Sequence, residues 1–251
     1  CDLGENSKII ECKNDKKLLK VVNTANIACG YHAGNKLIMM ETIKNAKINN
    51  VSIGAHPGFK DKRNFGRKRI NLTQNEIYKL ILDQLIIISK IADTFNFPIT
   101  HVKPHGALNN IACEDLNTAI TIGKAINYFQ RDLIYMILPL TKMHKAANKL
   151  NMKYACEIFA DRNYNDKGLL IDRSNPQSLI EDVNESINNI LFMLDNKCIK
   201  TISGKILKTD IDTICIHGDN LKAIEISKKL KIALINNNIK LLPLNKLSKF
   251  N

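Results

Sequence analysis

The sequence predicts an α/β fold in which residues 1–251 form a single domain, a seven-stranded β/α barrel of TIM-like form. Short apolar or β-branched runs alternate with longer helical patterns, and this alternation indicates βαβ units and a parallel sheet. Seven strand candidates suit a closed or nearly closed barrel, and no linker rich in Pro, Gly or Ser divides the chain. A doubly wound open sheet is the competing architecture. Its dinucleotide-binding version is disfavoured, because no G-x-G-x-x-G follows the first strand.

The strands are expected where β-branched and apolar residues form short runs. The first strand ends at residues 1–3, and the others cover residues 21–29, 51–55, 99–103, 133–138, 153–159 and 213–217. A small hairpin is expected at residues 201–207, TISGKIL, with its turn at Ser203 and Gly204.

Helical patterns fill the segments between these strands. They cover residues 36–49, 74–95, 115–129, 141–150, 177–195 and 220–237. The second opens with TQNE, from Thr73 to Glu76, which is a capping-box pattern. The fifth follows Asn175 and Pro176, an N-cap residue with proline in the first turn.

The net charge of +13 raises the possibility of nucleic-acid binding. Most of the 37 basic residues are Lys, they are scattered, and no basic stripe with interleaved aromatic residues occurs. A solvated basic surface is the simpler interpretation. No apolar run reaches the roughly 18–20 residues of a membrane span. We therefore expect neither nucleic acid nor a membrane as a partner.

The cysteines indicate a reducing compartment. Their number, seven, is odd and no C-x-x-C occurs, which argues against a disulfide framework and against a structural zinc site. We expect a cytoplasmic protein whose thiols are mostly small core residues. The chain begins at CDLGE, which looks like the middle of a motif, and a preceding segment is left open.

Polar side chains gather in the stretch HVKPH, residues 101–105. Histidines four apart suit a metal-binding helix, but a residue before proline is pushed out of the helical region, so Lys103 is expected to be extended. Extended chain has a period of two, which places His101, Lys103 and His105 on one face. The spacing is therefore a feature of a strand end. His101 lies early in the strand and is expected to be a buried support.

The other predicted strands also end in polar or small residues. Because the carboxyl ends of parallel strands form the ligand face of β/α folds, we expect these side chains to meet in one pocket. A single histidine at such an end is more often a core or capping residue. The hypothesis of one shared pocket therefore depends on polar residues occurring at several strand ends. The residues concerned are Asp2, Glu5, Asn26, His32, His56, His105, Glu157, Asp161, His217 and Asp219.

The ordered motifs CDLGE, NIACGYHAG, GAHPGF, HVKPHGALNN, EIFADR and HGD together resemble the LamB/YcsF family over nearly the whole chain. The resemblance implies a seven-stranded barrel of the glycoside hydrolase/deacetylase type. It also implies the activity of the A subunit of ATP-dependent 5-oxoprolinase. That activity converts 5-oxo-L-proline, ATP and water to L-glutamate, ADP and phosphate, together with 5-oxoprolinase subunits B and C. Asn109 departs from the family pattern, which usually has Tyr there, and the DLN that precedes CDLGE in the family is missing.

The catalytic residues are expected among the acids and imidazoles of the strand ends. Neutral imidazole titrates near the working pH, so His56 or His105 is a candidate general base for water. A carboxylate would orient that base or take the proton, and the candidates are Asp2, Glu5, Asp161 and Asp219. The competing role of such a carboxylate is helix N-capping, most of all for Asp219, which precedes a helix. The catalytic set is Asp2, His56, His105, Glu157, Asp161 and His217.

Substrate binding is expected from Glu5, Asn26, His32, Lys103, Arg162 and Asp219. Lys103 or Arg162 offers a cation for a substrate carboxylate or phosphate, and a structural ion pair with Glu157 or Asp161 is the alternative. No G-x-x-x-x-G-K-[ST] loop occurs, so ATP is expected at a site shared with partner subunits or of an unfamiliar kind. A divalent metal ion is a further possibility, with His32, His56 and His105 as candidate ligands.

Two other classes of function stay open. A stand-alone metal-dependent hydrolase of a carbohydrate amide would act without ATP or partner subunits. A non-catalytic nucleic-acid-binding or scaffold protein would bind DNA or RNA with a steep dependence on salt, but it leaves the clustered histidines unexplained.

Overall fold

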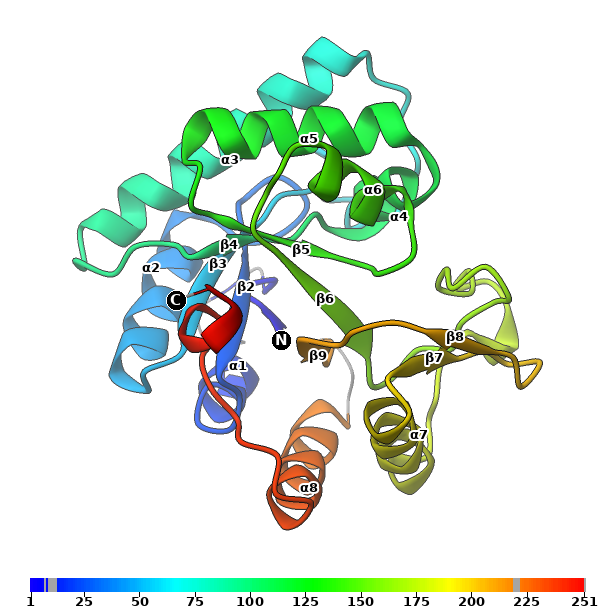
Figure 1. The fold of residues 1–251 in the computed structure, drawn as a ribbon. Helices are drawn as coiled ribbons and strands as arrows, with labels where there is room; N and C mark the ends of the chain where they lie inside the picture. The colour runs from blue at the N-terminus through cyan, green and yellow to red at the C-terminus, as the bar shows by residue number, and fades with distance from the viewer. Residues whose placement is uncertain (7, 9–12, 219–221, 251) are drawn as a thin grey trace.

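Seven parallel strands form a barrel in the computed structural model, which describes residues 1–6, 8, 13–218 and 222–250. Their order is β1-β2-β3-β4-β5-β6-β9 (Figure 1). The barrel strands thus follow one another in chain order, and only the separate pair β7-β8 comes between β6 and β9. A parallel bridge between Asp2 and His217 brings the end of β9 next to β1 and nearly closes the sheet. The predicted barrel is confirmed. The strands are β1 (Asp2–Leu3), β2 (Thr24–Ala28), β3 (Ser52–His56), β4 (His101–Val102), β5 (Ile134–Ile137), β6 (Tyr154–Phe159) and β9 (Thr213–Cys215).

Five strands are shorter than the sequence predicts, and the strands expected at 21–29 and 99–103 lose the most residues. The strand expected at 21–29 begins at Thr24, because the backbone N–H groups of Val21 and Val22 donate to the Leu18 carbonyl and close the preceding helix. The strand expected at 99–103 is reduced to two residues. Its ladder nevertheless continues on both sides, since Thr100 N–H donates to Ile53 and Lys103 N–H to Ala55.

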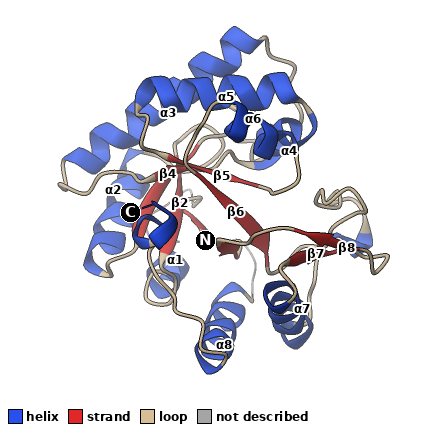
Figure 2. Cartoon of the chain, in the orientation of Figure 1, coloured by secondary structure: helices blue, strands red, loops and turns tan. Residues whose placement is uncertain are grey.

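Helices surround the strands on the outside of the barrel (Figure 2). Six of them correspond to predicted helices, although the first residues of the predicted 220–237 helix lie partly outside the described residues. The capping box of α3 is confirmed, because Thr73 and Glu76 each accept from the backbone N–H of the other. The six are α2 (Lys36–Ile48), α3 (Gln74–Asp93), α5 (Leu116–Phe129), α6 (Lys142–Lys149), α7 (Val183–Asp195) and α8 (Ala223–Asn236).

The prediction of one helix over 177–195 is wrong at its start. Asn175 caps only a short 3-10 turn, Pro176–Ser178. The helix α7 begins after Asp182, whose side chain accepts from the backbone N–H of Glu185. Two further 3-10 turns, Leu244–Lys246 and Ser248–Phe250, lie near the C-terminus.

Two helices were not predicted, α1 (Lys13–Leu18) and α4 (Gly106–Glu114). The sequence of α4, GALNNIACE, contains one Gly and two Asn, which have low helix propensity. Its apolar side, with Leu108 and Ala112 fully buried, packs into the core and stabilises the helix. This helix matters for function because it starts directly after His105.

The predicted hairpin is confirmed, with its first strand before the expected segment and its second strand overlapping the end of that segment. Strand β7 (Cys198–Lys200) pairs antiparallel with β8 (Ile206–Lys208), and Gly204 supplies a positive φ of 86° in the turn. The hairpin projects away from the barrel (Figure 1). The cysteines behave as expected within the described residues, where all six are free and buried, whereas Cys12 lies outside them.

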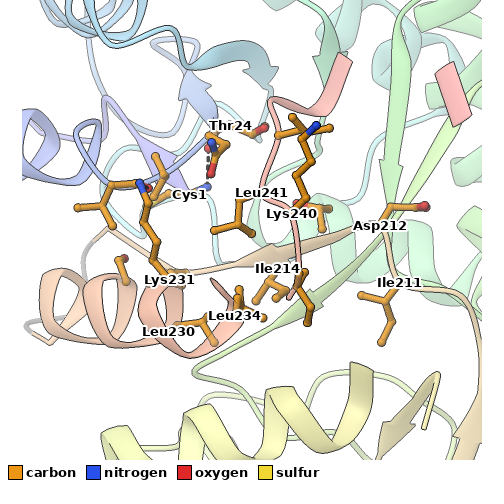
Figure 3. A pocket seen from close by; sticks show the side chains of 18 of the residues that line it. Cys1, Thr24, Ile211, Asp212, Ile214, Leu230, Lys231, Leu234, Lys240 and Leu241 are labelled. Carbon is orange, nitrogen blue, oxygen red and sulfur yellow. Dashed lines mark hydrogen bonds between the residues drawn. The ribbon is translucent and has the colours of Figure 1, made fainter. Parts of the chain in front are cut away.

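The two ends of the barrel differ in character. At the amino ends of the strands a cavity of about 310 Å³ is lined mainly by aliphatic side chains, among them Ile214, Leu230 and Leu241 (Figure 3). The clustered histidines and carboxylates lie at the opposite end, where the strands finish. Among the described helices, none is both long enough and apolar enough to cross a bilayer.

Candidate active site

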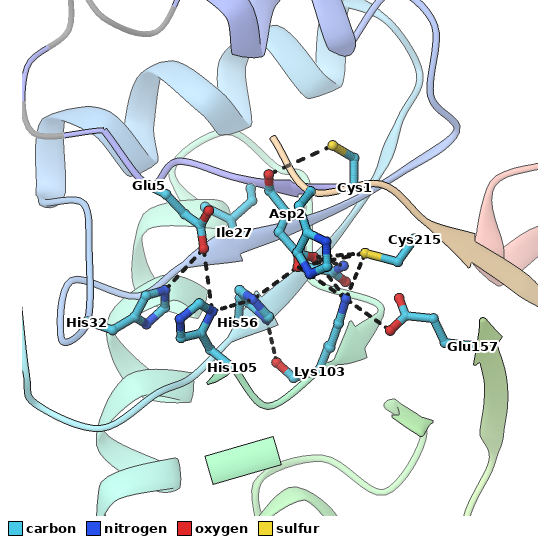
Figure 4. A network of polar contacts seen from close by, with 12 residues as sticks. Cys1, Asp2, Glu5, Ile27, His32, His56, Lys103, His105, Glu157 and Cys215 are labelled. Carbon is cyan, nitrogen blue, oxygen red and sulfur yellow. Dashed lines mark hydrogen bonds and ion pairs between the residues drawn. The ribbon is translucent and has the colours of Figure 1, made fainter. Parts of the chain in front are cut away.

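A buried ionic group occupies the middle of the barrel. Lys103 extends from the end of β4, and its Nζ lies 3.0 Å from Asp2 Oδ1 and 2.9 Å from Glu157 Oε2 (Figure 4). The Cys215 thiol lies 3.0 Å from the same ammonium. Asn26 donates to Asp2 Oδ1 over 2.7 Å. The group therefore links β1, β2, β6, β9 and the residue that follows β4.

The charges of this group follow from the balance of burial and attraction. Burial alone would raise the pKa of Asp2, but Lys103 lowers it well below its ordinary value. Burial alone would lower the pKa of Lys103, but Asp2, followed by Cys215 and Glu157, raises it well above its ordinary value. Burial raises the pKa of Glu157 above its ordinary value, and the nearby Lys103 ammonium only partly offsets this effect. Asp2 and Lys103 are therefore the ionised pair, and Glu157 takes up a proton more readily.

His101 is linked to this group through Asn26. It is fully buried, as expected, and its Nε2 lies 2.9 Å from Asn26 Oδ1. A Cβ at Gly54 would collide with the His101 ring, so only glycine at this position of β3 leaves room for the imidazole. The hydrogen bonds run from His101 through Asn26 to Asp2.

Three imidazoles from different parts of the chain lie in contact beside the ionic group. His56 is the last residue of β3, His105 occupies the N-cap position of α4, and His32 follows β2. The rings of His32 and His105 are stacked, with centroids 3.8 Å apart and planes at 5°. His56 Nε2 lies 3.0 Å from His105 Nδ1, and Glu5 Oε1 lies 3.4 Å from the same His105 nitrogen (Figure 4).

Glycine makes room for this stack. A Cβ at Gly58 would lie 2.7 Å from His32 Nδ1. Gly66 has a φ of 62°, and a Cβ there would lie 2.8 Å from His32 Cβ. The glycines of the GAHPGF segment and of the following loop therefore let backbone approach the imidazoles closely.

A fourth histidine forms a pair with a carboxylate. His217 Nδ1 lies 2.9 Å from Asp161 Oδ1 and 3.1 Å from Oδ2. Because the carboxylate can only accept, Nδ1 carries the proton and Nε2 keeps its lone pair in the neutral ring. The ring stacks on Phe159, with centroids 5.4 Å apart, and retains 14% side-chain exposure.

A cavity of about 160 Å³ opens over these groups. Six residues predicted for the site line it: Asp2, His56, Lys103, His105, Arg162 and His217. Five other predicted residues are not part of this lining within the described residues, and they contact the lining residues on the side away from the cavity: Glu5, Asn26, His32, Glu157 and Asp161. Asp219 lies outside the described residues.

The structure gives Lys103 and Arg162 different surroundings. Lys103 makes the ion pair with Glu157 that the sequence offered as an alternative, together with a second pair to Asp2. The Arg162 guanidinium instead donates to the backbone carbonyls of Ser178 and Ile171. Both side chains still reach the cavity wall.

Two arginines of the cavity were missed by the sequence analysis. Arg67 and Arg173 come from loops, and no strand-end pattern marks either residue. Burial and the neighbouring Arg173 lower the pKa of Arg162 to about 10. Three guanidinium groups therefore give the cavity a cationic wall suited to an anionic ligand.

Comparison with known proteins agrees with this geometry. The sequence model of the LamB/YcsF family matches residues 1–249. The chain belongs to the LamB/YcsF family. A relative from Rhodopseudomonas palustris, named as the A subunit of 5-oxoprolinase, is 39% identical over 232 residues, 92% of this chain and 91% of the relative. Another of that name, from Clostridium beijerinckii, is 37% identical over 247 residues, 98% of this chain and 97% of the relative.

A solved structure is also similar to this chain. The lactam utilization protein from Thermus thermophilus is 33% identical in sequence and gives a TM-score of 0.88. The similarity covers 96% of each chain. The expected family and the barrel fold are thus both confirmed.

Proposed function

We propose that this protein is the A subunit of an ATP-dependent 5-oxoprolinase, which hydrolyses 5-oxo-L-proline to L-glutamate together with subunits B and C. The sequence supports this proposal, because nearly the whole chain is similar to relatives that are named as the A subunit of 5-oxoprolinase. A cytoplasmic location is part of the same proposal, since the free, buried cysteines suit a reducing compartment.

The observation that carries the chemistry is the His217–Asp161 pair at the cavity. Hydrolysis of a lactam requires a base that takes a proton from water as the oxygen attacks the carbonyl carbon. Asp161 holds the Nδ1 proton of His217, so the Nε2 lone pair is the acceptor for that proton. His56 and His105 were the bases expected from the sequence, but they contact each other and lie deeper in the barrel.

The cations of the site fit the substrate class. The carboxylate of 5-oxo-L-proline requires a positive partner, and Arg67, Arg162 and Arg173 line the cavity. Lys103 provides a fixed positive charge near the negative charge that develops on the carbonyl oxygen. The amine nitrogen released on ring opening takes back the proton held by His217.

The role of ATP is assigned to the complex as a whole. Transfer of the γ-phosphoryl group of ATP to the lactam oxygen would release ADP and convert a poor electrophile into a good one. Attack of water would then open the ring to an acyl phosphate, and a second water would release inorganic phosphate to give L-glutamate. This chain contains no G-x-x-x-x-G-K-[ST] loop, so we place the ATP site on one of the partner subunits or at a contact between subunits.

A second function is supported by the histidine cluster. Three imidazoles and a carboxylate in contact also suit a stand-alone metal-dependent hydrolase acting on a carbohydrate amide. Such an enzyme would need neither ATP nor partner subunits, which separates the two proposals by experiment.

The test is an assay of glutamate release from 5-oxo-L-proline, with the chain alone and with subunits B and C, each with and without ATP. We expect glutamate only when the chain, both partner subunits and ATP are all present. Release by the chain alone without ATP would favour the stand-alone hydrolase. If no combination forms glutamate while the chain remains folded, the proposed function is wrong.

A further inference from the structure

The hydrogen bonds of His56 and His105 define where each ring keeps its lone pair. His56 Nδ1 lies 2.7 Å from the Lys103 carbonyl oxygen, and His105 Nε2 lies 2.8 Å from the Phe65 carbonyl oxygen. A carbonyl oxygen only accepts, so each of these nitrogens carries a proton. Two N–H groups cannot point at one another at hydrogen-bond distance, so the two remaining nitrogens, His56 Nε2 and His105 Nδ1, hold at most one proton between them.

The two facing nitrogens are close enough to bind the same cation. His56 Nε2 lies 3.0 Å from His105 Nδ1, and two unprotonated nitrogens at this distance repel unless a cation lies against both. Two nitrogens bound to one metal ion at about 2.0–2.1 Å are themselves about 2.9–3.4 Å apart for angles between square and tetrahedral. The observed separation lies in that range.

A third imidazole and a carboxylate converge on the same point. Glu5 Oε1 lies 3.4 Å from His105 Nδ1 and 3.5 Å from His32 Nε2. His32 is only 1% exposed, and neither of its ring nitrogens makes a hydrogen bond within the described part of the chain. All four donor atoms lie within 4.8 Å of one another, so a small side-chain rotation brings them onto one ion.

We propose that Glu5, His32, His56 and His105 bind one divalent transition-metal ion. The ligand atoms are Glu5 Oε1, the Nε2 atoms of His32 and His56, and His105 Nδ1. Three imidazoles and one carboxylate favour Zn²⁺ or a neighbouring first-row ion over Mg²⁺ or Ca²⁺. The carbonyls of Lys103 and Phe65 act as the outer hydrogen-bond partners that typically fix metal-binding imidazoles.

The neighbouring group of Asp2, Cys215 and His217 does not offer an equivalent site, although its ligand atoms are also close together. The Lys103 ammonium lies 3.0 Å from both Asp2 Oδ1 and the Cys215 sulfur, and this positive charge repels a second cation. A proton shared by His56 and His105 is the competing explanation for their close approach. It would relieve that one contact and leave the buried His32 ring without a hydrogen bond.

Metal binding at this cluster does not require the proposed reaction, so it is measured without substrate. The full chain is stripped with a chelator, titrated with Zn²⁺ in a calorimeter, and titrated with Co²⁺ while its visible absorption is recorded. We expect one ion per chain and a Co²⁺ spectrum with ligand-field bands of a nitrogen and oxygen site. The variants His105→Ala and Glu5→Gln are expected to weaken the Kd for Zn²⁺ by at least about 10-fold.

His144→Ala is the matched control. His144 forms a hydrogen bond with Tyr154 on the outside of the barrel, and it belongs to none of the groups of potential metal ligands among the described residues. Its Kd should equal that of the original chain. Glu5→Gln preserves the size of the side chain and keeps the test informative should His105→Ala fail to fold. The proposal is overturned if the stripped chain binds no Zn²⁺, or if Glu5→Gln binds as tightly as the control; the shared proton then accounts for the histidine pair.

Discussion

At the scale of single residues, the barrel interior holds charges where most proteins have aliphatic side chains. Lys103 is 3% exposed and lies between Asp2 and Glu157. The sequence indicated that these residues share the strand-end face, since each lies in or at the end of a predicted strand and points to that face. It could not predict that one ammonium serves two carboxylates, because that depends on distances between strands far apart in the chain.

Removing the central cation should strongly destabilise the fold. In Lys103→Met the Asp2 and Glu157 carboxyl groups stay buried without a positive partner, so the free energy of unfolding should fall by about 3–5 kcal/mol. The measurement is urea unfolding monitored by circular dichroism.

Lys153→Met is the control, since Lys153 pairs with Asp132 in an exposed position, 44% and 78% accessible. Its effect should stay within about 1 kcal/mol. Equal losses in the two variants would show that the buried group is not a centre of stability.

At the scale of elements, local signals in the sequence predicted helix ends better than strand lengths. Thr73 and Glu76 marked the start of α3 correctly, because a capping box is a pattern of adjacent residues. Asn175 and Pro176 carried a similar signal but cap only a 3-10 turn. Helix α4 was missed because packing, rather than propensity, stabilises it.

The cap of α3 should contribute measurably to stability. Thr73→Ala removes the oxygen that accepts from the Glu76 backbone N–H, and the expected loss is about 1 kcal/mol in the free energy of unfolding. Thr209→Ala is the control, since Thr209 lies outside the helices and its hydroxyl donates to the Asp210 carbonyl in an exposed hydrogen bond. A urea midpoint that is the same in both variants would contradict this role of the cap.

At the scale of the whole molecule, the barrel brings together groups that the chain keeps far apart. Asp2 and His217 lie at opposite ends of the chain, yet a backbone bridge joins them where the sheet closes. The rule that parallel strands present ligands at their carboxyl ends was enough to predict this gathering. The rule did not tell which of these residues line the cavity and which lie beneath its surface. It also did not predict Arg67 and Arg173, because their positions depend on loop conformation.

The most direct test of this gathered site is the turnover of His217 variants in the proposed complex with subunits B and C. Glutamate release from 5-oxo-L-proline and ATP is compared for the original chain, His217→Gln and His144→Gln, with folding checked by circular dichroism. We expect His144→Gln to match the original chain and His217→Gln to lose kcat by about 10²–10⁴-fold, the usual contribution of a general base. Undiminished turnover in His217→Gln would contradict the assignment of the pocket at the strand ends as the catalytic centre.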